Sequence, residues 1–124
     1  MAQYRSLKKD FFTSASITVL SPWARLFYQA TWLEADREGR LKRDYQTLKN
    51  RYFPADAIDL MELGDELKAE GLIKLYEVDG KQYAWIPTFA DHQVINNREK
   101  ASVLPAPVGK EGKVKLGKVS KEGA

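Results

Sequence analysis

Residues 56–89 read DAIDLMELGDELKAEGLIKLYEVDGKQYAWIPTF, and this stretch decides how the chain is expected to fold. Leucines recur at helical spacing in its first half, which predicts a helix over residues 56–70. Gly71 follows, and glycine best tolerates the left-handed conformation that ends a helix. Two short strands, 72–78 and 81–87, flank Asp79-Gly80, a two-residue loop that favours a tight hairpin. The stretch therefore predicts a helix followed by a β-hairpin.

Upstream, a helix is expected to begin at Ser21-Pro22. Serine caps a helix through its side chain, and proline suits the first helical position because its missing donor costs nothing there. A stripe of apolar side chains follows at helical spacing and predicts a buried face rather than a ligand pocket: Trp23, Leu26, Phe27, Ala30 and Leu33. In the arm before this helix, Phe11 and Phe12 are expected to fold back onto the core.

A second helix is expected after Asp44, which offers a cap, and before Phe53-Pro54. Between the two helices, Gly39 offers a stop, and Arg40–Lys42 is expected to form a short strand that pairs with the hairpin. The order helix, strand, helix, helix, hairpin is typical of an α+β fold, the winged helix-turn-helix. The sequence therefore predicts a three-helix core with a C-terminal wing.

Composition fits one domain and a tail. The chain has 124 residues, of which 44% are hydrophobic and 30% charged, enough for a core in a domain of about 100 residues. We expect that domain, with its N-terminal arm, over residues 1–105 and a flexible basic linker or tail over 106–124. Cysteine is absent, which excludes disulfides and thiolate zinc sites. No apolar run approaches the roughly 18 residues of a membrane span, so a cytoplasmic location without membrane contact is expected.

Charge is unevenly distributed along the chain. Residues 1–53 carry 10 Lys and Arg against 5 acids, residues 54–80 carry 2 against 8, and residues 81–124 carry 8 against 4. Basic ends around an acidic centre are compatible with nucleic acid as a partner. The acidic centre coincides with the helix of residues 56–70, and phosphates would repel its outward face: Asp59, Glu62, Asp65, Glu66 and Glu70. This helix therefore either avoids the usual groove or contacts a protein.

The hairpin predicts two different faces. Alternation and the two-residue loop pair Tyr76 with Tyr83 and Lys74 with Trp85 on one face, and Leu75 with Ala84 on the apolar face. Cations and large rings on one face suit phosphate contact and stacking on bases. The alternative is that the rings pack under the segment that follows the hairpin, and the sequence leaves both open.

Polar side chains follow the hairpin and offer hydrogen bonds to phosphate, sugar or bases. His92 is the only histidine, and no nucleophile or metal-ligand spacing accompanies it. Gly-rich phosphate loops and carboxylate or histidine clusters are also missing. The sequence therefore predicts neither an enzyme nor a cofactor or metal site.

The chain resembles the N-terminal winged-helix domain of phage and prophage replication proteins of the replisome-organiser or replication-initiator type. The resemblance covers most of residues 5–105 and rests on these residues: Phe11-Phe12, Leu20-Ser21-Pro22, Ala24-Arg25-Leu26, Trp32, Ala35 to Leu41, Phe53-Pro54, Gly71-Leu72-Ile73, Tyr76 to Lys81, Ile86-Pro87, Phe89 and His92-Gln93. It implies the fold, DNA binding in replication initiation, and a second domain after a linker. At Asn97-Arg98-Glu99 the chain departs from the family pattern, where a proline is expected.

The leading hypothesis is a DNA-binding domain for a phage-type replication origin, acting on duplex and also single-stranded DNA. The residues expected to contact DNA surround the second helix, the wing and the segment after it: Lys42, Arg43, Lys49, Arg51, Lys74, Tyr76, Lys81, Tyr83, Trp85, His92, Gln93, Asn96, Asn97 and Arg98. One alternative is a protein-interaction module that recruits a helicase or its loader through the acidic helix. Another is a phage transcriptional regulator.

Overall fold

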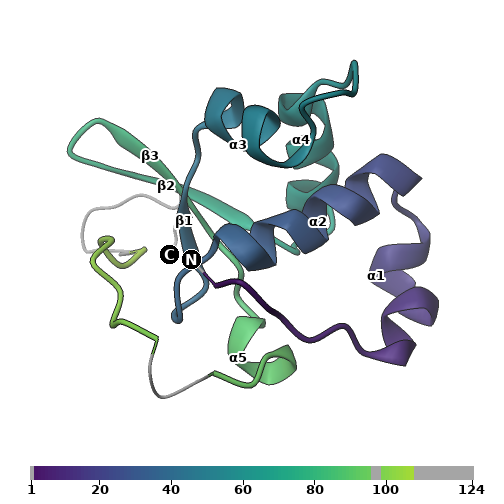
Figure 1. Ribbon diagram of the computed structural model, residues 1–124, viewed down its shortest axis with the longest axis horizontal. Coiled ribbons are helices and arrows are strands. Elements are labelled where there is room, and N and C mark those ends of the chain that lie inside the picture. The colour runs from purple at the N-terminus through teal and green to yellow at the C-terminus, as the bar shows by residue number, and fades with distance from the viewer. Residues whose placement is uncertain (1, 96–98, 108–124) are drawn as a thin grey trace.

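The computed structural model describes residues 2–95 and 99–107, and its architecture is α+β (Figure 1). In chain order its elements are η1 (Lys9–Thr13), α1 (Ala15–Thr18), α2 (Pro22–Glu34), β1 (Arg40–Lys42), α3 (Tyr45–Tyr52), α4 (Leu60–Ala69), β2 (Lys74–Val78), β3 (Lys81–Trp85) and α5 (Phe89–His92). Within the described residues, the strands form an antiparallel sheet in the order β1-β3-β2. The predicted α+β class is confirmed.

The hairpin has the predicted turn and register. Asp79 and Gly80 have φ values of 53° and 78°, and positive φ at both central residues is what a type I′ turn requires. Tyr76 lies opposite Tyr83, as predicted, and β1 pairs with β3 on its other side. Both hairpin strands are shorter than predicted, because the ladder begins at Lys74 and ends at Trp85.

Side-chain caps set the starts of the helices. Ser21 accepts from the backbone N–H of Ala24 at 3.2 Å, and Asp44 caps α3 in the same way, so both predicted starts are confirmed. The third helix begins at Leu60 and not at residue 56 as predicted. Asp59 accepts from the N–H of Met61 at 3.0 Å, with φ −106° and ψ 105°. A capping residue has an extended backbone, so the helix cannot continue upstream through it.

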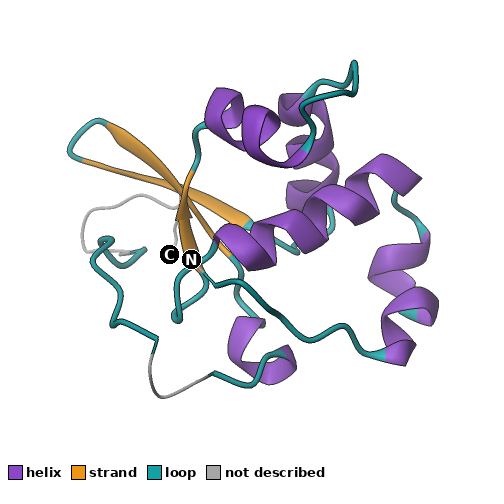
Figure 2. Cartoon of the chain, viewed as in Figure 1, coloured by secondary structure: helices purple, strands orange, loops and turns teal. Residues whose placement is uncertain are grey.

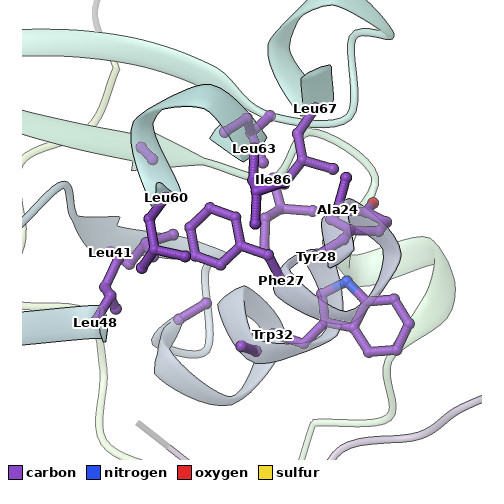
Figure 3. Packing of buried hydrophobic residues seen from close by; sticks show 14 of the residues in the cluster. Ala24, Phe27, Tyr28, Trp32, Leu41, Leu48, Leu60, Leu63, Leu67 and Ile86 are labelled. Carbon is purple, nitrogen blue, oxygen red and sulfur yellow. The ribbon is translucent and has the colours of Figure 1, made fainter. Parts of the chain in front are cut away.

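The core lies between the sheet and helices α2, α3 and α4. Phe27 is nearly inaccessible to solvent and lies among Leu41, Leu60 and Ile86 (Figure 3). These four residues come from α2, β1, α4 and the segment after β3, so one ring joins distant parts of the chain. Removal of this apolar surface from water is the main stabilising contribution expected for the fold.

The buried face of α2 differs from the predicted stripe. Trp23 is 41% exposed and Leu26 49% exposed, whereas Tyr28 and Trp32 are buried. The cause is a second covering element, because Phe11 of η1 packs edge-on against Trp32 with ring centres 5.4 Å apart. Because α2 is covered on two sides, its buried face includes Tyr28 and Trp32 and leaves Trp23 and Leu26 exposed. Phe11 folds onto the core as predicted, but Phe12 is exposed, so that part of the prediction is wrong.

Candidate nucleic-acid interface

The sheet has an inner face toward the helices and an outer face away from them. Side chains alternate along a strand, and the register places Leu41, Leu75 and Ala84 on the inner face, in or against the core. The outer face consists of the side chains at the intervening positions: Arg40, Lys42, Lys74, Tyr76, Val78, Lys81, Tyr83 and Trp85. The predicted division into an apolar face and a face of rings and cations therefore holds.

The two outer-face tyrosines are buried, however. Tyr76 and Tyr83 are 4% and 7% exposed, and their rings stack with centres 5.3 Å apart. The hydroxyl of Tyr76 donates to the carbonyl oxygen of Pro105 at 2.7 Å, and burial raises the pKa of Tyr76 well above its usual range. The prediction that these rings are open to bases is wrong for this arrangement. The alternative, packing under the segment that follows the hairpin, is what the structure shows.

That covering segment is residues 99–107, which we name the strap. In Figure 1 the strap is yellow-green and lies across the hairpin from α3, and Figure 2 shows it without helix or strand. Arg40 donates from Nη1 to the carbonyl oxygen of Leu104 at 3.2 Å. The hydroxyl of Ser102 donates to Oδ2 of Asp36. Hydrogen bonds therefore attach the strap to β1 and to the loop before it.

Arg5 fixes the start of the strap. Its Nη1 and Nη2 donate to both carboxylate oxygens of Glu99, at 2.8 and 2.9 Å, while Nε donates to the carbonyl oxygen of Trp32 at 2.9 Å. Its guanidinium carbon lies 4.8 Å from the centre of the Phe89 ring. Sequence analysis did not find this pair, because an ion pair between residues 94 positions apart leaves no local pattern.

The outward side of α3 presents neutral polar groups. Leu48 is buried, and Tyr45 and Tyr52 are half-buried against the core, so Gln46, Thr47 and Asn50 point to solvent. Nε2 of Gln46 donates to Oδ1 of Asn50 at 3.0 Å, one helical turn away. Sequence analysis missed both amides because it searched this helix for cations.

Arg43 connects α3 to the hairpin. Its backbone N–H donates to the carbonyl oxygen of Gln82 at 3.1 Å, its guanidinium donates to Oε1 of the same residue, and its Cζ lies 5.9 Å from the Tyr45 ring centre. All these partners are neutral, so none of them forms an ion pair with Arg43. Lys42 directly precedes Arg43, and Lys81 directly precedes Gln82 in β3; both lysines are exposed. We name the group Arg43, Gln46, Thr47, Asn50, Lys81 and Gln82 the α3 edge.

Two predicted contacts have internal partners instead. Nζ of Lys49 donates to the carbonyl oxygen of Phe53 at 3.0 Å. Arg51 donates to both carboxylate oxygens of Glu34, at 2.7 and 2.9 Å, and the hydroxyl of Tyr52 donates to Glu34 at 2.9 Å. Burial, with that hydrogen bond, raises the pKa of Tyr52 to about 12. Arg51 and Tyr52 join α3 to α2, and Lys49 bonds the end of its own helix, so we leave these residues out of the α3 edge.

The segment after the hairpin is divided between solvent and structure. His92 is exposed. Gln93 is buried, and its amide both accepts from Ser6 N–H at 2.7 Å and donates to Ser6 carbonyl oxygen at 3.0 Å. The prediction that Gln93 contacts DNA is therefore wrong, because its hydrogen-bonding groups hold the N-terminal arm. The predicted contacts Asn96, Asn97 and Arg98 lie outside the described residues.

Some acids of α4 have structural partners. The carboxylate of Glu66 accepts from the backbone N–H of Ser21 at 2.9 Å and from its hydroxyl at 2.8 Å, and Asp59 caps the helix itself. Glu62, Asp65 and Glu70 are exposed. The outward side of α4 therefore remains acidic.

Residues 2–95 and 99–107 contain neither a candidate metal cluster nor a candidate membrane-spanning helix. These residues contain no group of three or more His, Asp or Glu side chains arranged to hold a metal ion. None of their helices has the length and apolar character to cross a membrane. Comparison with known proteins found no matching protein-family model, no matching curated protein and no matching solved structure.

Proposed function

We propose that this chain is a DNA-binding domain of the winged helix-turn-helix type that docks its α3 edge on duplex DNA. The order of helices and strands and the β1-β3-β2 sheet are compatible with that fold. The observation that carries the proposal is the exposed pair of amides on α3, Gln46 and Asn50, beside Arg43. Asn and Gln amides can read adenine in the major groove, while Arg and Lys contact phosphate or guanine.

Helix α3 suits this role better than α4. In a winged helix the helix just before the wing usually enters the groove, and here that helix is α4. Its exposed Glu62, Asp65 and Glu70 would face phosphates of like charge. Asp44, Glu77 and Asp79 near the α3 edge keep their charge, because hydrogen bonds from neutral groups such as Thr47 and Gln82 do not remove it. Lys42, Arg43 and Lys81 balance these acids, whereas α4 has Lys68 against three exposed acids. Electrostatics therefore favours docking through α3 and the hairpin turn.

The proposed biological setting is initiation of phage-type DNA replication. This setting rests on the resemblance to replisome organisers described in Sequence analysis. A transcriptional regulator would use the same interface. The two settings are separated by measuring whether the protein occupies a replication origin or promoters.

The test is a fluorescence-anisotropy titration of the full chain with a labelled mixed-sequence duplex at low and high salt. Arg43→Ala and Lys81→Ala should each weaken binding roughly three- to tenfold at low salt and reduce the salt dependence, because each removes a cation from the phosphate interface. Lys68→Ala, which removes an exposed cation from α4, is the matched control and should leave affinity unchanged. Equal losses for Arg43→Ala and Lys68→Ala would contradict docking through the α3 edge.

A second candidate function is capture of a protein partner with a basic surface, such as a helicase or its loader, through α4. It is favoured by exposed carboxylates beside an exposed apolar side chain, Met61. Glu62→Lys with Asp65→Lys should abolish capture of such a partner and leave duplex binding unchanged or stronger. Glu66 is unsuitable for this test because it bonds Ser21.

A further inference from the structure

We propose that the outer face of the sheet is a second binding site, for single-stranded DNA, and that the strap covers it in this structure. Apart from Lys81 beside the hairpin turn, which belongs to both, the residues of this second site differ from those of the α3 edge proposed for duplex DNA, and the strap lies across the hairpin from α3 (Figure 1). The second site is therefore a further binding activity and does not depend on duplex recognition.

The side chains of the outer face have the composition of a single-strand site. Their outward strand positions hold four cations, three aromatic rings and a valine, and no acid. Stacked Tyr76 and Tyr83 lie in the middle of the sheet, with Trp85 one row away and lysines at the margins. Proteins bind single strands by stacking bases on such rings while cations contact the phosphates.

The strap is attached mainly by hydrogen bonds and an ion pair, and its Leu104 and Pro105 are half-buried. Val103, in its centre, is 94% exposed. Its attachments include the Glu99 ion pair with Arg5, a hydrogen bond from Arg37 to the Glu99 carbonyl oxygen, and hydrogen bonds at Ser102, Leu104 and Pro105. Neither Tyr76 nor Tyr83 belongs to the core cluster; Tyr76 bonds the strap at Pro105 and stacks on Tyr83. Segments with few buried apolar contacts open at low free-energy cost.

The strap also supplies acceptors of the kind that a nucleic-acid backbone supplies. Arg5 holds a carboxylate in a bidentate pair, and Arg40 and the Tyr76 hydroxyl bond strap carbonyl oxygens. Phosphate oxygens accept from the same donors. Nε of Arg40 is buried with no hydrogen-bond partner among the described residues, so the strap satisfies this side chain incompletely.

A hollow adjoins the strap, and none of the three outer-face rings lines it. A hollow of about 1140 Å³ lies between the strap, the N-terminal arm and β1, and cationic side chains outnumber carboxylates in its lining. Opening the strap would join this cationic hollow to the aromatic rings of Tyr76, Tyr83 and Trp85 on the outer face. If binding requires the open strap, the apparent affinity for single strands falls with the fraction of open molecules.

The experiment measures binding of the full chain to labelled oligo-dT by anisotropy, with hydrogen exchange of the strap amides in parallel. Ser102→Ala removes the bond to Asp36, and Tyr76→Phe removes the bond to Pro105 while keeping the ring; neither changes charge. Each should speed strap exchange and tighten oligo-dT binding about three- to tenfold, since one hydrogen bond shifts such an equilibrium by about that factor. Adding Tyr83→Ala to Ser102→Ala should remove the gain, because a stacking ring is lost.

Val103→Ala is the matched control: it changes an exposed strap residue and should change neither exchange nor affinity. Unchanged oligo-dT affinity in both strap variants would overturn the proposal, whether or not strap exchange speeds up. The same titrations with duplex DNA separate this inference from the proposed function. If both the duplex function and this proposal hold, Arg43→Ala should weaken duplex binding while the oligo-dT response to the strap variants stays intact. A chain that binds no duplex but responds to strap release would refute only the duplex function.

Discussion

The inner and outer faces of the same small sheet are covered in different ways. Helices cover the inner face through apolar side chains such as Phe27 and Leu60, which share the core with Leu41 of β1 (Figure 3). The strap covers the outer face through an ion pair and hydrogen bonds from Arg5, Arg40 and Tyr76. The first kind of cover is expected to open only when the domain unfolds, and the second can open locally. Burial alone therefore does not show that a side chain is structural.

The largest effect should come from the inner side. Phe27→Ala removes a ring that joins α2, β1 and α4 and leaves a cavity, so it should lower the free energy of unfolding by about 3–5 kcal/mol. Val103→Ala in the strap should change it by less than about 0.5 kcal/mol. Urea denaturation of both variants measures the difference. Similar losses for the two would break the comparison between the faces.

A smaller effect is expected when hydrogen bonds beside the core are removed, and it can be compared with the loss of a hydrogen bond in the strap. Glu66→Ala should cost about 1–3 kcal/mol of unfolding free energy, because the N–H and hydroxyl of Ser21 lose a charged acceptor beside the core. Glu62→Ala, on the exposed side of the same helix, is its control and should cost less than about 0.5 kcal/mol. Ser102→Ala should resemble Glu62→Ala in thermal denaturation, since the strap opens before the domain unfolds. A cost for Ser102→Ala equal to that of Glu66→Ala would mean that strap and core unfold together.

The smallest effect is a pH dependence confined to the strap. Hydrogen bonds from Arg5 hold the pKa of Glu99 below its ordinary value of 4.5. A carboxyl whose pKa is lowered by folding contributes stability above its ordinary pKa and loses it as pH falls through the lowered value. Strap amides should therefore lose protection below about pH 4.5, after correction for intrinsic exchange, while core amides stay protected. Glu99→Gln should remove this pH dependence, and its persistence in that variant would exclude Glu99 as the cause.

Much of the fold could be predicted from local sequence chemistry. Asp79-Gly80 determined the hairpin turn and the pairing of Tyr76 with Tyr83, and Ser21 and Asp44 marked two helix starts. The errors arose where distant elements meet. The buried face of α2 was misjudged because Phe11 covers Trp32, a contact that helical periodicity within α2 does not contain.

The candidate site was less predictable than the fold. Gln93 resembles a surface hydrogen-bonding residue in sequence but bonds Ser6, 87 positions away. The tyrosines of the hairpin were correctly placed on the outer face, but the hydrogen bond from Tyr76 to Pro105 carries no periodic signal. The amides of Gln46 and Asn50 stand out once Leu48 is known to face the core. Site residues depend on tertiary neighbours, which a single sequence does not specify.

The central claim is that duplex DNA contacts the α3 edge, whereas single-stranded DNA contacts the outer face and displaces the strap. The most direct measurement is an amide chemical-shift titration of isotope-labelled protein with duplex DNA and, separately, with oligo-dT. We expect duplex to shift the signals of Thr47, Asn50 and Gln82, and oligo-dT to shift the Trp85 indole and the strap amides. Shifts centred on Glu62 and Asp65 with either DNA, or strap amides unmoved by saturating oligo-dT, would contradict the claim.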